Sequence, residues 1–308
     1  MANNNEENLS RTQRKGQTGQ NKPTKKKQPQ KAPKKKLTVG KIIWRTFATL
    51  FILGCLAFLG GVGLFWYYAK DAPKIEDSKL DAAASSTFYA GDTPIADLGA
   101  ERREKVDSQD IPQLLEDAIV SVEDRRFYKH IGVDPIRIVG SALSNVTSGG
   151  MQGGSTLTQQ LIKLSFFSTK ASDQTLKRKA QEAWMAVQLE KEKSKEEILT
   201  YYINKVYMSN GISGMQTASL AYFGKPLKEL NLAQTALLAG MPQAPESYDP
   251  YRHGDVAKKR RDIVLYTMLE NKKITQKEYD DAVKTPIDDG LIKFEDTRQD
   301  WAEYDGYI

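Results

Sequence analysis

Twenty-four consecutive uncharged residues, from Thr46 to Ala69, constrain this 308-residue chain more than any other feature. At about 1.5 Å of rise per residue, a helix of this length reaches about 36 Å, more than the roughly 30 Å hydrocarbon core of a bilayer. Trp44 precedes the run and aromatic residues close it at 66–68, as at a membrane interface. We therefore predict one transmembrane helix over residues 44–69.

A cleaved signal peptide and a buried core helix are the alternatives for this run. A signal peptide has an apolar core of about 7–15 residues and ends at a small-residue cleavage site. This run is longer, ends in bulky aromatic residues and follows a lysine cluster. These features favour an uncleaved single-pass anchor.

Charge is distributed unevenly about the anchor. Residues 1–45 hold 13 of the 45 Lys and Arg but 2 of the 39 Asp and Glu, so the rest of the chain is mildly acidic. The positive-inside rule then predicts a cytoplasmic N-terminus, with residues 70–308 outside the cell. Residues 1–43 are expected to be a disordered tail that is attracted to anionic lipids rather than to nucleic acid.

The chain has few residues that form disulfides or hold metals. Cys55 is the only cysteine, which excludes an intramolecular disulfide framework and a cysteine-based zinc site. The only histidines are His130 and His253, and neither lies in an HExxH pattern, so a histidine-rich metal centre is excluded. Hydrophobic residues make up 40% and charged residues 27%, which is typical of a globular domain.

Helical periodicity dominates the chain after residue 110, so the predicted fold class is mainly α. We expect Asp110 and Asp173 to cap helices, and Ser194 with Glu197 forms a capping-box pattern. A short strand–turn–strand pattern precedes them over 85–98. The expected helices begin at residues 110, 134, 173 and 194 and span 230–238, 257–270 and 275–284.

Glu123 is the first candidate catalytic residue. It lies eight and four residues after Leu115 and Ile119, so its carboxylate continues the apolar stripe of its helix. A carboxylate on a buried face suits a general acid or base. The alternative is a helix-end carboxylate that pairs with an arginine at 125–126, and the same choice applies to Asp124.

The segment MQGGSTLTQQLIKL, residues 151–164, is rich in groups that bind phosphate or sugar hydroxyls. Its glycines allow backbone conformations that other residues disfavour, and its hydroxyls, amides and lysine are hydrogen-bond donors. The segment lacks the GxxxxGK[ST] spacing of a nucleotide-binding loop, and a plain capped loop is the alternative. The candidate ligand-binding residues in it are Ser155, Thr156, Gln159, Gln160 and Lys163.

The segment KRKAQE, residues 177–182, contains a second acidic candidate. Arg178 and Glu182 are four residues apart, which is typical of a surface ion pair. Glu182 also points away from the apolar stripe expected over residues 176–187, so its carboxylate could instead face a cleft. The spacing alone leaves both interpretations open.

Five blocks in a fixed order are more specific than any one of them. They read EDRRFYKHIGVD, GGSTLTQQLIK, RKAQE, ILTYYINKVYMSNGISGMQTASLAYFGK and LNLAQTALLAGMPQAPESYDP. With these blocks, roughly residues 75–270 resemble the family 51 peptidoglycan glycosyltransferases, the transglycosylase domains of class A penicillin-binding proteins. The resemblance implies a lysozyme-like, mainly α domain with a small membrane-apposed lobe. Ser213 stands where an aromatic residue often precedes a glycine, which we expect to be neutral.

The resemblance implies a cell-membrane enzyme, inhibited by moenomycin, that polymerises lipid II into β-1,4-linked glycan and releases undecaprenyl diphosphate. Glu123 matches the catalytic base, and Glu182 matches the second acidic position near the departing diphosphate. Polar and basic positions of the donor site match Ser155, Gln160, Lys163, Arg178 and Lys179. Further substrate-binding candidates in the same blocks are Asp124, Thr156 and Gln159.

The implied partners are lipid II, the growing glycan strand, the bilayer and other cell-wall synthesis or division proteins. An α-linked donor that gives a β-linked product requires inversion, with a base on one face and charge stabilisation at the diphosphate on the other. Lysine, arginine or a divalent cation, Mg²⁺ or Mn²⁺, can supply that stabilisation. The sequence identifies no metal ligand, and we expect no organic cofactor.

Two other functions are considered. A lysozyme-like lytic enzyme also uses one central glutamate but has no evident use for the cations at 163, 178 and 179, and a non-catalytic scaffold needs neither Glu123 nor Glu182. Family members of this architecture continue into a penicillin-sensitive transpeptidase, whose SxxK and KTG motifs are absent here. We expect residues 70–285 to form the glycosyltransferase domain, and 286–308 to begin a linker of a truncated bifunctional protein.

Overall fold

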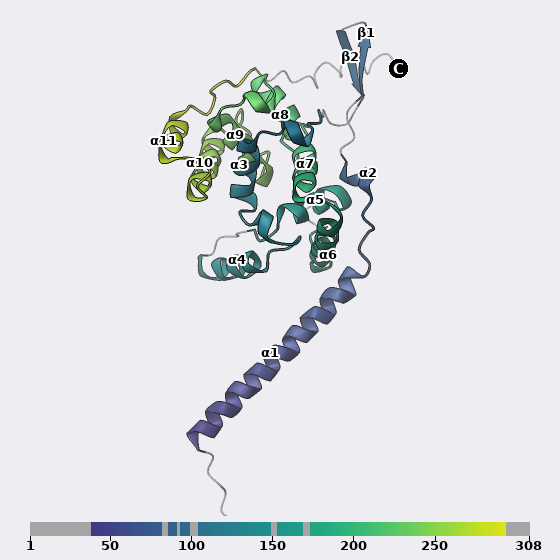
Figure 1. Cartoon of the computed structure of the whole chain (residues 1–308), viewed down its shortest axis with the longest axis vertical. Coiled ribbons are helices and arrows are strands. Elements are labelled where there is room, and N and C mark those ends of the chain that lie inside the picture. Colours follow the sequence, from purple (N-terminus) through teal and green to yellow (C-terminus); the bar gives the residue numbers. More distant parts are fainter. Residues whose placement is uncertain are drawn as a thin grey trace, which may run out of the picture. The chain divides into compact units, whose positions relative to one another are not determined.

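The computed structural model describes residues 38–81, 86–90, 93–98, 104–148, 153–168 and 173–293 (Figure 1). Nearly all of the basic tail and the turn predicted at 91–92 lie outside this set. The chain divides into two compact units, residues 1–56 and 57–308. The described residues are mainly helical, which confirms the predicted fold class.

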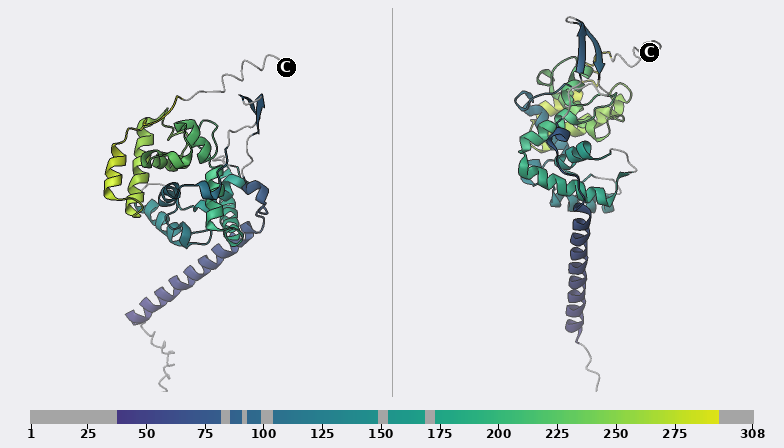
Figure 2. Two further views of the ribbon diagram at one scale, coloured as in Figure 1. Left: turned by 45° about the horizontal axis from the view of Figure 1, so that its top comes forward. Right: turned by 90° about the vertical axis from the view of Figure 1, so that its right-hand side faces the viewer.

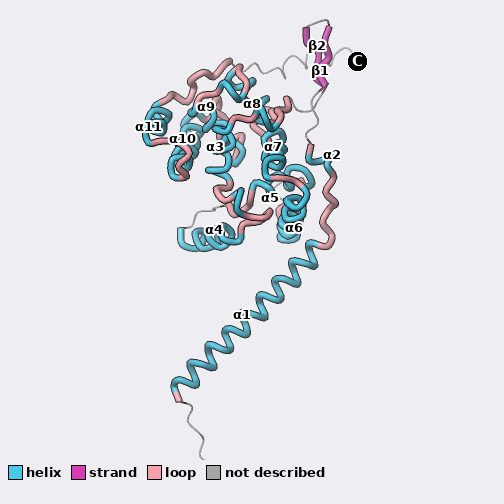
Figure 3. The backbone as a smooth tube through the Cα atoms, in the orientation of Figure 1, coloured by secondary structure: helices cyan, strands magenta, loops and turns pink. Residues whose placement is uncertain are grey.

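Strands β1 (Ser86–Ala90) and β2 (Thr93–Leu98) form the predicted antiparallel hairpin, drawn in magenta in Figure 3. Its register shifts between Phe88 and Tyr89. This hairpin holds all the strand residues among those described, so helices carry the fold.

Helix α1 (Val39–Ala69) contains the whole predicted membrane span, and it begins before residue 44, so the prediction of a disordered tail is wrong for residues 39–43. Of the helices in the described ranges, it alone is long and apolar enough to cross a bilayer, and its most apolar stretch is not buried within the protein. Its 31 residues rise about 46 Å. The helix ends where Lys70, Asp71 and then Pro73 follow, because charge and proline both disfavour its continuation in lipid.

The helices at 77–80, at 113–123 and between residues 157 and 284 contribute residues to one hydrophobic core. Helix α9 packs against α3 and α10, and α5 packs against α6 and α7, as the views of Figure 2 also show. Short 3₁₀ turns occupy 108–110, 127–129, 227–229 and 241–243. The helices are α2 (Asp77–Leu80), α3 (Gln113–Glu123), α4 (Pro135–Ser148), α5 (Leu157–Phe166), α6 (Leu176–Glu192), α7 (Lys195–Lys205), α8 (Met215–Phe223), α9 (Leu232–Gly240), α10 (Gly254–Glu270) and α11 (Gln276–Lys284).

Two of the predicted helix caps are wrong. Pro112 occupies the N-cap position of α3, and Asp110 ends a 3₁₀ turn before it. Thr175, not Asp173, caps α6, where its hydroxyl accepts a hydrogen bond from the backbone N–H of Arg178 at 3.1 Å. Each aspartate lies too far upstream, because a capping side chain must reach the second or third N–H of its helix.

The capping box predicted at the start of α7 is confirmed. The Ser194 hydroxyl accepts from the Glu197 N–H at 3.1 Å, and the Glu197 carboxylate accepts from the Ser194 N–H at 2.7 Å. The same box begins three more helices, α5, α9 and α11. Helix α8, which begins at a glycine without a side-chain cap, was not predicted.

The buried face of α6 differs from the predicted apolar stripe. Leu176 is 78% exposed, and the other predicted stripe residues are half-buried, namely Ala180, Ala183, Trp184 and Val187. The inward face combines apolar and charged residues, namely Arg178, Gln181, Glu182, Met185, Ala186 and Leu189. The apolar pattern was misleading because the charged members of this face pair with each other inside the protein.

Gly132 lets the loop after α3 lie directly on the backbone of α6. Its φ is +82°, and a Cβ there would lie 2.5 Å from backbone atoms of Ala186 and Val187. We expect Gly132→Ala to lower the free energy of unfolding by about 2–4 kcal/mol, from overpacking and left-handed strain. Thermal unfolding followed by circular dichroism measures this. Gly140→Ala, where a Cβ meets nothing within 4 Å, should leave stability unchanged or slightly higher.

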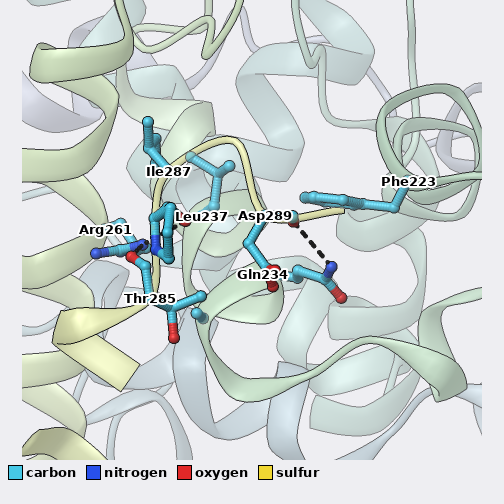
Figure 4. Close-up of a pocket in the computed structure, with 9 residues that line it drawn as sticks. Phe223, Gln234, Leu237, Arg261, Thr285, Ile287 and Asp289 are labelled. Atoms are coloured by element: carbon cyan, nitrogen blue, oxygen red, sulfur yellow. Dashed lines mark hydrogen bonds between the residues drawn. The ribbon is translucent and has the colours of Figure 1, made fainter. Parts of the chain in front are cut away.

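The chain after α11 folds back onto α9 and α10. Arg261, 1% exposed, donates to the carbonyl oxygen of Thr285 at 2.7 Å, and Gln234 donates to that of Asp289 at 3.1 Å. Between these contacts lies a cavity of about 10 Å³, which is the size of one water (Figure 4). Residues 285–289 therefore lie against the helical domain, and the domain boundary at 285 stays a prediction.

Candidate functional site

Glu123 lies at the C-terminal end of α3 and is 8% exposed. Its Oε1 accepts from the Arg260 guanidinium at 2.9 Å, and its Oε2 accepts from the Gln160 amide at 3.0 Å. The pairing considered with an arginine at 125–126 is not found, because Arg126 pairs with Asp134 at 2.8 Å. Both carboxylate oxygens thus face polar groups brought in from distant helices.

Arg260 reaches Glu123 because Gly240, at the end of α9, leaves room for its side chain. A Cβ on Gly240 would lie 3.0 Å from Arg260 Cγ, and the Gly240 carbonyl accepts from Arg260 Nε at 2.9 Å. Sequence reasoning missed this residue. The available signal was its position on the buried stripe of α10, between Ala257 and Val264, where an arginine is unexpected.

Tyr202 on α7 orients Gln160. Its hydroxyl donates to the Gln160 amide oxygen at 3.3 Å, which turns the amide nitrogen toward Glu123. Burial, with the negative charge of Glu123, raises the pKa of the Tyr202 phenol well above its ordinary value, so the hydroxyl keeps its proton. Tyr202 was also missed, since a tyrosine on the buried face of a helix resembles any core residue.

Asp124 connects the end of α3 to the start of α5. It is fully buried, and its Oδ2 accepts from the Leu157 backbone N–H at 3.0 Å and lies 2.8 Å from His130 Nε2. Thr156 and Gln159 form the capping box of α5 and are also buried. These three predicted substrate-binding residues position α5 in the structure described here, and their contact with substrate stays a prediction.

Glu182 on α6 is fully buried between two cations. Its Oε1 lies 3.0 Å from Arg178 Nε, and its Oε2 accepts from Lys179 Nζ at 2.7 Å. The Arg178–Glu182 pair considered from the sequence exists, but in the interior rather than on the surface. Lys179 also donates to the Ser155 hydroxyl at 3.3 Å, which joins the glycine-rich segment to α6.

Lys163 on α5 lies within electrostatic range of both glutamates. Burial, then the nearby charges of Lys179 and Arg178, lower the pKa of its ammonium, while Glu182 and Glu123 raise it. Within the described ranges, no hydrogen bond or ion pair joins its amine to another group. The site therefore holds a partly desolvated cation whose charge is not neutralised by a direct contact.

The charges near Lys163 sum to a positive value. Two glutamates, Glu123 and Glu182, face the cations Lys163, Arg178, Lys179 and Arg260. In the part of the chain that the structure describes, no group of three His, Cys, Asp or Glu comes together as a metal site. The carboxylates are held by cations instead, so these residues alone do not fit a resident metal ion, and a divalent-cation requirement stays a prediction.

Arg260 should be strongly coupled to Glu123. We expect Arg260→Ala to lower the free energy of unfolding by about 3–5 kcal/mol, because it leaves a buried carboxylate without its charge partner. In a Glu123→Gln background the same substitution should cost clearly less, since no buried charge remains. A double-mutant cycle by denaturant unfolding in detergent measures the difference. Equal costs in both backgrounds would contradict the coupling.

Residues 91–269, more than half of the chain, match the family model described as Transglycosylase. The chain belongs to the transglycosylase family. The matched range contains Glu123, Glu182 and every cation of the site, Arg260 included. The predicted family resemblance is confirmed.

Several penicillin-binding proteins are similar to this transglycosylase chain. Penicillin-binding protein 1A of Streptococcus oralis is 57% identical over 257 residues, which are 83% of this chain and 40% of that protein. The protein of the same name from Streptococcus pneumoniae is 55% identical over 81% of this chain and 35% of its own length. A solved penicillin-binding protein 1A from Haemophilus influenzae has a TM-score of 0.43 and 25% identity, covering 73% of this chain and 24% of that one. The chain thus spans about two fifths or less of these relatives.

Proposed function

We propose that this chain polymerises lipid II into β-1,4-linked glycan, with inversion at the donor sugar and release of undecaprenyl diphosphate. Family membership supports the reaction class, and the charge arrangement supports the assignment of its parts. The observation that carries the proposal is Lys163, a cation without a direct partner in the described residues, whose pKa is influenced by the charges of both Glu123 and Glu182.

Glu123 is the proposed general base. Its carboxylate is held by Gln160 and Arg260 at the end of a rigid helix, so it has a fixed direction toward an incoming hydroxyl. The acceptor sugar hydroxyl loses its proton to Glu123 while its oxygen attacks the donor carbon. The bond from that carbon to the diphosphate breaks on the opposite face, as inversion requires.

The cations on α5 and α6 are the proposed diphosphate site. Among the described residues, Lys163 has no neutralising contact that a diphosphate would have to replace. Lys179 contacts Glu182 and Ser155 through its partly exposed ammonium. A diphosphate that accepts hydrogen bonds from these groups is stabilised as negative charge develops on it. Glu182 then serves to hold Arg178 and Lys179 in place rather than to transfer a proton.

The membrane anchor fits a lipid-linked substrate. If α1 spans the bilayer with its lysine-rich side in the cytoplasm, the helical domain lies outside, where lipid II diphosphate would be at the membrane surface. Anchoring keeps the enzyme and its substrate in the same two-dimensional layer. Treatment of intact cells with an external protease tests this orientation. We expect residues 1–37 to be protected and the helical domain to be cleaved.

Gel separation of glycan chains tests the reaction. Detergent-solubilised protein is incubated with labelled lipid II, with and without Mg²⁺ or Mn²⁺, and the products are resolved by length. We expect a ladder that disappears with moenomycin. Consumption of lipid II to short, lysozyme-like fragments would instead indicate a lytic enzyme, and a folded protein that leaves lipid II unchanged would contradict the proposal.

A further inference from the structure

A second cavity lies where α1 ends. It has a volume of about 400 Å³ and is lined by the last turn of α1, by residues 72–75 and by one face of α6. This volume is within the range of small-molecule sites. None of the residues that the proposed reaction uses contributes to its wall.

The polar wall of this cavity consists mainly of hydrogen-bond donors. Lys70 contacts only the ring of Tyr67, at 5.0 Å, and no ion pair involves Lys74 among the described residues. The exposed carboxylate of Glu192 is the one acidic group on the wall, so the lining has a net positive charge.

The apolar wall is aromatic. The rings of Trp66 and Trp184 lie 4.9 Å apart, and Met185 with Ile75 completes this side. Tryptophan prefers the depth of the lipid ester groups, where one part of its ring is apolar and its N–H is wet. Trp66 is in the last turn of the helix that spans the membrane, so the cavity is at that depth.

We propose that this cavity, named here the Trp66–Trp184 groove, binds the headgroup of an anionic phospholipid. Donors on one wall and indoles on the other match a phosphate joined to a glycerol ester. Lys70 and Lys74 would bind the phosphate. The inference rests on the proposed membrane span but not on the proposed reaction.

Quenching by brominated lipids tests the proposal in vesicles of phosphatidylcholine. Phe substitutions at Trp44, Trp66 and Trp301 leave Trp184 as the only tryptophan. Phosphatidylglycerol brominated near the ester end of its chains should quench Trp184 at a lower mole fraction than brominated phosphatidylcholine does. The expected ratio is about 25-fold, from roughly a factor of five for each of two lysines. Lys70→Gln with Lys74→Gln should abolish the preference.

A control variant that loses two lysines outside the groove tests whether the preference depends on Lys70 and Lys74. Lys228→Gln with Lys259→Gln, which removes the same charge outside the groove, should keep the preference. Equal quenching by both lipids, or a preference that survives loss of Lys70 and Lys74, would overturn the proposal. Full displacement of brominated phosphatidylglycerol by equimolar lipid II would also overturn the proposal, because it would show that the groove binds the substrate.

The membrane span is checked separately with Trp66 as the only tryptophan. Quenching of Trp66 by both brominated lipids shows that α1 is inserted. If Trp66 is quenched and Trp184 is not, lipid binding in the groove is contradicted, whereas membrane insertion of α1 is supported. None of these measurements requires turnover, so the result is independent of whether the chain polymerises lipid II.

Discussion

Glu123→Gln should lower the rate of lipid II polymerisation by about 100- to 10,000-fold, the usual contribution of a general base. The amide keeps the size of the side chain and can still accept from Arg260, so the protein should remain folded and bind lipid II. The rate is measured as loss of labelled lipid II under single-turnover conditions. Circular dichroism and thermal unfolding report on the fold of the variant.

Glu229→Gln is the matched control for this change. Glu229 is exposed and lies in a 3₁₀ turn outside the proposed site, so its loss should leave the rate within about twofold, as for most surface substitutions. A Glu123→Gln protein with near-normal turnover would remove Glu123 from the mechanism. The family assignment would survive that result, since it rests on the whole matched range.

Lys163→Met should lower turnover by about 100- to 1,000-fold, which is typical for loss of one group that stabilises developing charge. The long side chain is kept and the ammonium is removed. Lys163→Arg should recover part of the rate, because a guanidinium still donates to phosphate from nearly the same place. Turnover by Lys163→Met that equals turnover by Lys163→Arg would contradict a role for the charge.

The same substitution should make the protein more stable. Burial and the neighbouring cations lower the pKa of Lys163 in the folded state, so the folded state disfavours its charged form. The unfolded chain then holds the proton more tightly, and stability should rise with pH between the lowered value and the ordinary one. Lys163→Met removes this penalty, so its unfolding temperature at neutral pH should exceed that of the parent. A lower temperature would mean that the ammonium has a partner in the fold.

Local patterns in the sequence predicted the parts of the fold that are locally determined. The Ser194 capping box is confirmed because its groups are three residues apart and need no tertiary contact. Glu123 is buried as its spacing from Leu115 and Ile119 indicated. The long apolar run forms one helix, since lipid-length apolar segments have few other stable forms.

Contacts between distant segments could not be predicted in this way. Arg260 is 137 positions from Glu123, and only the packing of α10 against α3 and α9 brings the two together. The interior face of α6 was misjudged because Arg178 and Glu182 read as surface residues, although their mutual pairing allows burial. The roles of Asp124, Thr156 and Gln159 within the fold likewise depend on the contact between α3 and the start of α5.

A paired measurement of undecaprenyl diphosphate binding and of turnover, on Glu123→Gln and Lys163→Met side by side, separates the base from the diphosphate site. Glu123→Gln should bind the diphosphate lipid as the parent does and fail in turnover. Lys163→Met should bind it at least about tenfold more weakly, the effect of losing one charge-assisted contact. If both variants bind normally, or if Glu123→Gln loses binding as Lys163→Met does, the division of the site into these two parts is contradicted.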